Sequence, residues 1–194
     1  MRILVGITGA SGSAYARKLL AFLASRRIET HCCVSRSGRV TWDWELGGAP
    51  LVEASLAAPV RFYDEDDLMS PMASGSFRHD GMVVVPCSMR TLGALANGTA
   101  SNLVQRAAEV CLKERRKLVL VVRETPYSLT HLENMVRVTA AGAVVLPASP
   151  GFYHRPQSME DLTDFIVSRA LDHLGIENDL IRRWGSVPQE VSGK

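Results

Sequence analysis

Long hydrophobic runs are missing from this sequence of 194 residues, and no apolar stretch approaches the ~20 residues that a membrane-spanning helix needs. A large excess of either charge is missing too, because the sequence has 22 Lys and Arg residues and 20 Asp and Glu residues, which gives a net charge of +2. This balance argues against a protein that binds nucleic acid or a charged membrane surface. The sequence begins with an apolar strand pattern instead of a signal peptide, so we expect a cytoplasmic protein.

Metal-binding and nucleophile motifs are also absent. Of the four cysteines, Cys32 and Cys33 are adjacent and would point to opposite faces of a strand, while Cys87 and Cys111 have no ligand-like spacing to another cysteine. The histidines show no spacing typical of a zinc site, and neither a His-Glu-x-x-His nor a Gly-x-Ser-x-Gly motif occurs. We therefore expect reduced thiols and no bound metal.

Short apolar runs that alternate with amphipathic segments predict an α/β fold, in which helices cover both faces of a doubly wound parallel sheet in three layers. The runs predicted as strands are 2–7, 28–35, 82–85, 118–122 and 143–146. The main predicted helices are 37–46, 102–114, 128–141 and one that Ser158 and Asp161 cap at its start. Residues 47–80 are expected to be irregular, with an acidic solvated loop at 64–67, and both Trp42 and Trp44 fall on the helix before them. We expect one domain over residues 1–185 and a flexible tail over 186–194.

Hydroxyl and charged side chains follow nearly every predicted strand. The segments at the strand ends are Thr8–Ser11, Ser35, Pro86–Thr91, Arg123–Glu124 and Pro147–Gly151. Ligands of parallel sheets bind outside these carboxyl ends. At the first of them, a Gly/Ser turn before a helix offers free N–H groups and a positive dipole end, which favour an anion such as phosphate. The alternative is that Ser, Gly and Pro are simply the residues of which turns are made.

Three cations fall where a ligand anion could meet them. Arg106 and Lys113 lie seven residues apart on one helix face, although Glu109 between them explains the set equally well as surface ion pairs. Arg169 follows Leu162 by seven residues and shares its apolar stripe, so it needs either a structural partner or a ligand.

Six motifs in one order carry a family resemblance. They are Thr8-Gly9-Ala10-Ser11-Gly12, Pro86-Cys87-Ser88-Met89-Arg90-Thr91-Leu92, Lys113-Glu114-Arg115-Arg116, Arg123-Glu124-Thr125-Pro126, His131-Leu132-Glu133-Asn134-Met135 and Pro147-Ala148-Ser149-Pro150-Gly151-Phe152-Tyr153-His154-Arg155-Pro156. From about residue 2 to Trp184 the chain resembles the UbiX family of flavin prenyltransferases.

The resemblance implies a flavodoxin-like fold that binds FMN and assembles as a homo-oligomer, a dodecamer. It implies transfer of a dimethylallyl group from dimethylallyl phosphate to reduced FMN without a metal, closing a fourth ring between flavin N5 and C6. The product, prenylated FMN, would serve a UbiD-type decarboxylase in ubiquinone synthesis or aromatic-acid metabolism.

The resemblance also implies roles for individual residues. The residues implied to bind FMN are Gly9, Ala10, Ser11, Ser35, Ser88, Met89, Arg90, Thr91 and Arg123. The residues implied to bind dimethylallyl phosphate are Ser74, Arg106, Lys113, Tyr153, Arg169 and Trp184. Among the catalytic residues, Ser11 and Glu45 would handle the proton, Lys113 would stabilise the leaving phosphate, and Glu124 would orient the cations.

Three other functions would share part of this pattern. A short-chain NADP dehydrogenase would share the first turn, but Tyr15 stands at its third glycine position and no Tyr-x-x-x-Lys pair occurs. A flavin-dependent cysteine decarboxylase would share the fold, but its Pro-Ala-Ser-Ala-Asn-Thr motif is absent. A carrier or accessory subunit of an aromatic-acid decarboxylase would bind FMN and release it unmodified.

Overall fold

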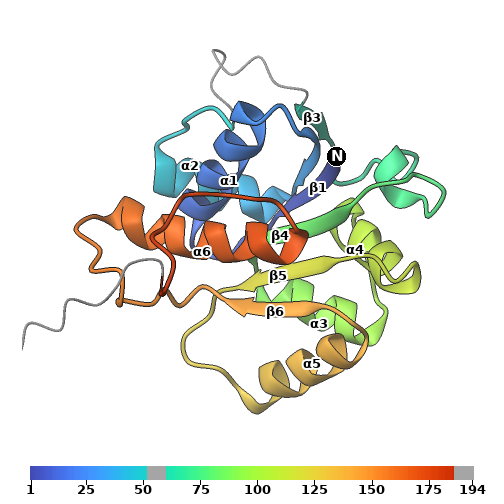
Figure 1. Ribbon diagram of the computed structural model, residues 1–194. Helices are drawn as coiled ribbons and strands as arrows, with labels where there is room; N and C mark the ends of the chain where they lie inside the picture. Colours follow the sequence, from blue (N-terminus) through green and yellow to red (C-terminus); the bar gives the residue numbers. More distant parts are fainter. Residues whose placement is uncertain (52–59, 186–194) are drawn as a thin grey trace, which may run out of the picture.

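One six-stranded sheet organises the protein, seen here in a computed structural model that describes residues 1–51 and 60–185. All strand pairs are parallel, and the order across the sheet is β3-β2-β1-β4-β5-β6 (Figure 1). The strands are β1 Arg2–Ile7, β2 Glu29–Val34, β3 Val60–Tyr63, β4 Gly81–Cys87, β5 Leu118–Val122 and β6 Val144–Pro147. The predicted tail, residues 186–194, lies outside the described residues.

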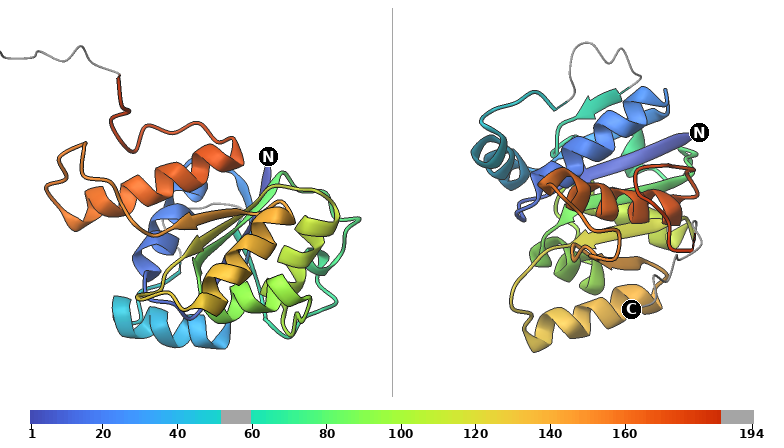
Figure 2. Two further views of the ribbon diagram at one scale, coloured as in Figure 1. Left: turned by 90° about the horizontal axis from the view of Figure 1, so that it is seen from below. Right: turned by 60° about the vertical axis from the view of Figure 1, so that its left-hand side comes forward.

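Helices cover both faces of the sheet, which confirms the predicted three layers. The helices are α1 Ser13–Ser25, α2 Arg36–Leu46, α3 Met89–Asn97, α4 Leu103–Lys113, α5 Leu129–Ala140 and α6 Met159–Leu174, with a 3-10 turn at Pro71–Ala73. α1 and α6 pack on one face, and α3, α4 and α5 on the other (Figure 2). As predicted, Ser158 caps α6 together with Asp161.

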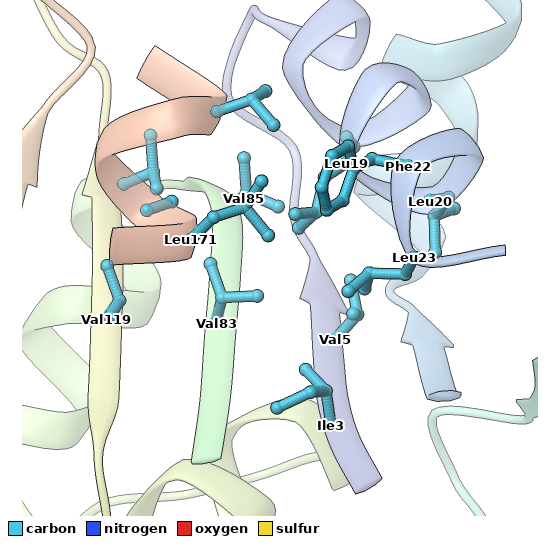
Figure 3. Close-up of a cluster of buried hydrophobic side chains, with 14 of the residues drawn as sticks. Ile3, Val5, Leu19, Leu20, Phe22, Leu23, Val83, Val85, Val119 and Leu171 are labelled. Atoms are coloured by element: carbon cyan, nitrogen blue, oxygen red, sulfur yellow. The ribbon is translucent and has the colours of Figure 1, made fainter. Parts of the chain in front are cut away.

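Two apolar cores, one on each face, explain why the central strands are hydrophobic without alternation. Val5, Val83 and Val119 point toward α1 and α6, where they meet Leu23 and Leu171 (Figure 3). The residues between them point to the opposite core, because successive side chains of a strand alternate between faces. A strand buried on both faces has no polar side to reveal its period.

The strand order reverses between β1 and β4. The Thr8 side chain bridges this point, since its hydroxyl donates to Pro86 O at 2.8 Å and accepts from Ser88 N at 2.9 Å. Without the edge strand β3, the other strands follow the flavodoxin-like order. All six strands end at the same edge of the sheet, and the ends of β1 and β4 lie side by side there.

Two details of the prediction were wrong. Residues 47–80 are not wholly irregular, because β3 adds to the edge of the sheet beside β2. β3 has only four residues and exposes Phe62, so its sequence carries little apolar signal. On α6, Leu162 is only half-buried, and Arg169 lies at the margin of the apolar stripe with 42% of its side chain exposed.

The two helix tryptophans divide between core and surface. Trp42 is buried and donates its indole N–H to Ala49 O at 2.7 Å, whereas Trp44 is 90% exposed. All four cysteines are buried and free. Burial raises the pKa of Cys87 and of Cys111 to about 12, so neither thiol is a ready nucleophile. Across the described ranges, no helix is both long and apolar enough to cross a membrane.

Candidate functional site

The turn between β1 and α1 is capped by a carboxylate from another helix. The Glu45 carboxylate accepts hydrogen bonds from Gly12 N at 3.0 Å and from Ser13 N at 2.8 Å. Gly12 is the N-cap of α1 and has φ 123°, a conformation that favours glycine, so it offers no side chain of its own for this cap. Burial raises the pKa of Glu45, but hydrogen bonds from Ser11, Ser13 and Gly12 outweigh it and hold the pKa below its usual value. The predicted pair Ser11 and Glu45 is therefore together, with the carboxylate ionised.

A polar pocket lies where two more helices begin. Ser35 is the N-cap of α2 and accepts from Gly38 N at 3.0 Å, and Ser88 is the N-cap of α3 and accepts from Thr91 N at 3.2 Å. A cavity of about 330 Å³ opens between them. Its walls are Ser35, Arg36, Ser37, Glu65, Asp66, Ser88, Arg90, Thr91, Ser101, Asn102 and Gln105. Two converging helix N-termini with hydroxyl side chains suit a phosphate group.

Arg123 supplies an unpaired donor at the end of β5. Its Nε is buried and has no hydrogen-bond partner among the described residues. A buried, charged donor without an acceptor costs free energy, so this position favours a ligand that accepts. Burial raises the pKa of the Tyr15 phenol while Arg123 opposes the shift, which places the guanidinium near α1. The orphaned donor and the pocket together fit a flavin phosphate such as FMN.

Some predicted flavin contacts are restricted to the backbone. The Met89 side chain packs in the core below α3, and Ala10 is buried with 7% exposure. At Gly9 an added Cβ would lie 2.6 Å from Ser37 Cβ, so the turn approaches α2 closely. Ser11, by contrast, is exposed and can reach a ligand.

Two of the residues predicted to bind dimethylallyl phosphate, the prenyl donor, lie on α4. Arg106 pairs with Glu109 at 3.7 Å, as the ion-pair alternative predicted. Lys113 instead pairs with Glu114, next to the loop that carries Ser74. A Cβ added at Gly75 would lie 2.8 Å from Lys113 Nζ. Ser74 and Lys113 are therefore neighbours, as the resemblance implied.

Other residues of this predicted set lie around α6. Arg169 pairs with Asp172 at 2.8 Å, and the Tyr153 ring meets the Trp184 ring edge to face at 5.3 Å. Phe165 packs edge to face on Tyr153 at 5.7 Å. Tyr153 and Trp184 thus form an exposed aromatic corner beside α6.

Within one chain these two groups do not meet. α4 packs on one face of the sheet and α6 on the other, so the sheet separates Lys113 from Arg169 (Figure 1). Glu124 accepts a hydrogen bond from Thr125 N at 3.0 Å. In the described part of the chain it forms no ion pair with Arg106, Lys113 or Arg169, the cations predicted to bind the prenyl donor. Its orienting role remains a prediction.

Glu65 is a residue of the pocket wall that no sequence pattern indicated. It lies in the acidic run expected to be solvated, yet its side chain is only 11% exposed. Its carboxylate accepts from Arg36 N at 2.8 Å and from Asn102 Nδ2 at 3.1 Å, joining the starts of α2 and α4 at the pocket wall. Asn102 is the N-cap of α4, and an N-cap residue at the start of this helix is the one signal in the sequence that could have located this wall. Within residues 1–51 and 60–185, no group of three or more His, Cys, Asp or Glu side chains gathers as metal ligands would.

Comparison with known proteins gives one consistent result. The flavoprotein family profile matches residues 1–171. Flavin prenyltransferase UbiX of Pseudomonas aeruginosa is 46% identical over 196 residues, covering 95% of this chain and 94% of that protein. The crystal structure of AnUbiX (PadA1) in complex with FMN and dimethylallyl pyrophosphate has a TM-score of 0.89 and 45% identity, over 96% of this chain and 98% of that one.

A structure described as a dodecameric FMN-dependent UbiX-like decarboxylase from Escherichia coli O157:H7 is also similar. Its TM-score is 0.87 at 41% identity, and the match covers 95% of this chain and 99% of that one. Identity above 40% over nearly the whole length accompanies a shared fold in both structures. The chain belongs to the flavoprotein family and, within it, to the UbiX-type flavin prenyltransferases.

Proposed function

We propose that this protein is a flavin prenyltransferase that moves a dimethylallyl group from dimethylallyl phosphate to N5 and C6 of reduced FMN. Family membership supports the activity. The observation that carries it in this chain is the orphaned Arg123 Nε at the end of β5, at the same edge of the sheet as the Ser11–Glu45 turn and the two-helix pocket. One domain, residues 1–185, would provide the flavin site, and we place the protein in the cytoplasm.

The chain's own residues account for the difficult part of the transfer. The C–O bond of the donor breaks and phosphate leaves with the electron pair, so negative charge grows on phosphate and positive charge on the allyl group. Lys113 and Arg169 would stabilise the former, because cations held in place favour charge that develops in the transition state. The ring faces of Tyr153 and Trp184 would stabilise the latter by cation–π attraction.

When the ring closes, the prenyl double bond gains a proton and C6 of the acceptor loses one, and Glu45 would accept the proton from C6. FMN, when bound, supplies the electron-rich N5 and C6 positions. The carboxylate is ionised across the neutral range, which a base requires, but its lowered pKa makes it a weaker acceptor. Ser11 would relay the proton, since its hydroxyl already contacts Glu45.

We further propose a homo-oligomer, a dodecamer, that completes the donor site. Lys113 and Arg169 lie on opposite faces of the sheet in one chain, so the α4 end of one copy would have to face the aromatic corner of another. The similar Escherichia coli structure is dodecameric, which supports such an assembly. The product would go to a UbiD-type decarboxylase.

Release of inorganic phosphate tests the reaction. The purified protein is incubated anaerobically with reduced FMN and dimethylallyl phosphate, and phosphate is measured against a reaction without FMN. We expect one phosphate per FMN consumed, and none without FMN. No FMN-dependent release from flavin-loaded protein would instead support the carrier function. A parallel reaction with dimethylallyl pyrophosphate, the ligand of the AnUbiX structure, is assayed for pyrophosphate, the leaving group of that donor, and tells which donor this chain uses.

A further inference from the structure

The carboxylate of Asp172, on the last turns of α6, joins three side chains. Oδ2 accepts from Arg169 Nη1 at 2.8 Å and from Arg183 Nη1 at 2.9 Å. Oδ1 accepts from Arg183 Nη2 at 2.7 Å and from Asn178 Nδ2 at 3.1 Å. A carboxylate has about four acceptor positions, so these four donors saturate it.

Asp172 also contacts the chain beyond α6, through Asn178 and Arg183. Residues 175–185 turn back and run along α6 (Figure 1). Ile176 and Leu180 anchor the first part of this segment to the apolar core. Its end is fixed differently, because Trp184 is 72% exposed and the preceding residue, Arg183, forms a two-pronged ion pair with Asp172.

We propose that Asp172 is a positioning residue for the prenyl donor: it fixes Arg169 and, through Arg183, holds Trp184 against Tyr153. The proposal rests on the proposed function, because it assigns the donor site to these residues. One carboxylate faces two guanidinium groups, so the cluster keeps a net positive charge. A donor phosphate could therefore engage Arg169 while Arg183 stays on Asp172.

A purely structural role predicts something different. Ion pairs at a partly exposed position contribute little to folding, so loss of the cluster should leave the fold intact. If Asp172 only stabilised the fold, its removal would weaken flavin binding and donor binding together. If it positions the donor site, the KM for donor alone should rise, because the pocket between α2 and α3 is built from other elements.

The test compares Asp172→Asn, Arg183→Gln and their combination in the full chain. We expect each single change to raise the KM for dimethylallyl phosphate about tenfold, the equivalent of roughly one charge-assisted hydrogen bond, with the Kd of FMN within about twofold. The KM for donor of the double variant should be no higher than that of Asp172→Asn, because both changes break the same ion pair between Asp172 and Arg183. Trypsin should also cut faster after Arg183 in Asp172→Asn, since the segment is released.

Asp179→Asn is the matched control, because Asp179 lies in the same segment but pairs with Arg26 at 3.2 Å on the surface. It should leave the KM for donor unchanged. An unchanged KM for donor in Arg183→Gln, or an equal rise of the FMN Kd, would overturn the proposal while the wild type still releases phosphate. A wild type that binds FMN but releases no phosphate would instead remove the proposed function, and the donor site with it.

Discussion

Glu45 combines two tasks that compete for the same carboxylate. As the cap of α1 it receives two backbone N–H groups, which hold its charge, and as the proposed base it must accept a proton. The cap keeps the carboxylate at a fixed place beside Ser11. The same hydrogen bonds therefore fix the place of the proposed base and lower its pKa, which makes it a weaker base.

Replacement of Glu45 by Gln separates these tasks. The amide oxygen can still accept from the turn, so FMN should bind with a Kd within a few-fold of wild type. Turnover should fall about 100-fold or more, the usual effect of removing a general base. Steady-state rates and FMN titration check this, with Asp43→Asn on the exposed side of α2 as control. A fully active Glu45→Gln protein would contradict the assigned role.

Glu29 makes stability depend on pH, far from the site. Hydrogen bonds from Arg2 and then His31 hold the pKa of Glu29 at about 2, against an unfolded value near 4.5. A lowered folded-state pKa means that the stabilisation is complete above the unfolded value and is lost as pH falls through the folded value. We therefore expect Glu29→Gln to unfold at a lower urea concentration than wild type at pH 7. The difference between the two urea midpoints should shrink between pH 5 and pH 2. The exposed Glu133→Gln should show no such narrowing; a gap independent of pH would contradict the assignment.

At the scale of elements, the docking of α2 on the end of β1 sets the site. Ser35 N donates to Ile7 O at 2.9 Å, and one turn on Gly38 lies against the same carbonyl group. A Cβ at Gly38 would lie 2.7 Å from Ile7 O, a backbone atom that cannot move aside. The helix carries both Ser35 and Glu45, so its placement affects the pocket and the turn together.

Gly38→Ala should therefore push α2 away from the sheet. We expect a loss of about 1–3 kcal/mol in the free energy of unfolding, together with weaker FMN binding. The matched change Gly93→Ala in α3 has its nearest contact at 3.4 Å and should be neutral or stabilise by up to about 1 kcal/mol. Denaturant unfolding and flavin titration measure both. Equal behaviour of the two variants would contradict the account of α2.

Elements with a strong pattern were predicted well, and contacts between elements were not. The apolar runs predicted five of the six strands, and the cap at Ser158 predicted the start of α6, all close to their observed bounds, because local sequence determines them. β3 was not predicted, because an edge strand needs no apolar alternation. The contacts of Glu65 and Asp172 were not predicted, because their partners lie on other elements or beyond a chain reversal, where no spacing rule applies. The family resemblance assigned roles to residues that periodicity alone left ambiguous, notably Arg106 and Lys113, and these roles stay predictions.

At the scale of the whole molecule, the proposed donor site implies that activity requires assembly, because Lys113 and Arg169 lie on opposite faces of the sheet in one chain. Lys113→Ala and Arg169→Ala should each be inactive alone. If one site takes Lys113 from one copy and Arg169 from another, their co-expression should restore roughly a quarter of the sites by random assembly. Lys113→Ala with Arg106→Ala, both on α4, should restore none. Failure of the first pair, in oligomers shown to contain both chains, would place both cations in one chain's own site.

The mass of the extracted flavin tests the central claim most directly. Reduced FMN and dimethylallyl phosphate are incubated anaerobically with wild-type protein and, in parallel, with Lys113→Ala and Arg169→Ala, and the flavin is then analysed by mass spectrometry. The account predicts a flavin heavier by one prenyl unit from wild type and unmodified FMN from both variants. Unmodified FMN from folded, flavin-loaded wild-type protein would contradict it and would make the chain a carrier of FMN.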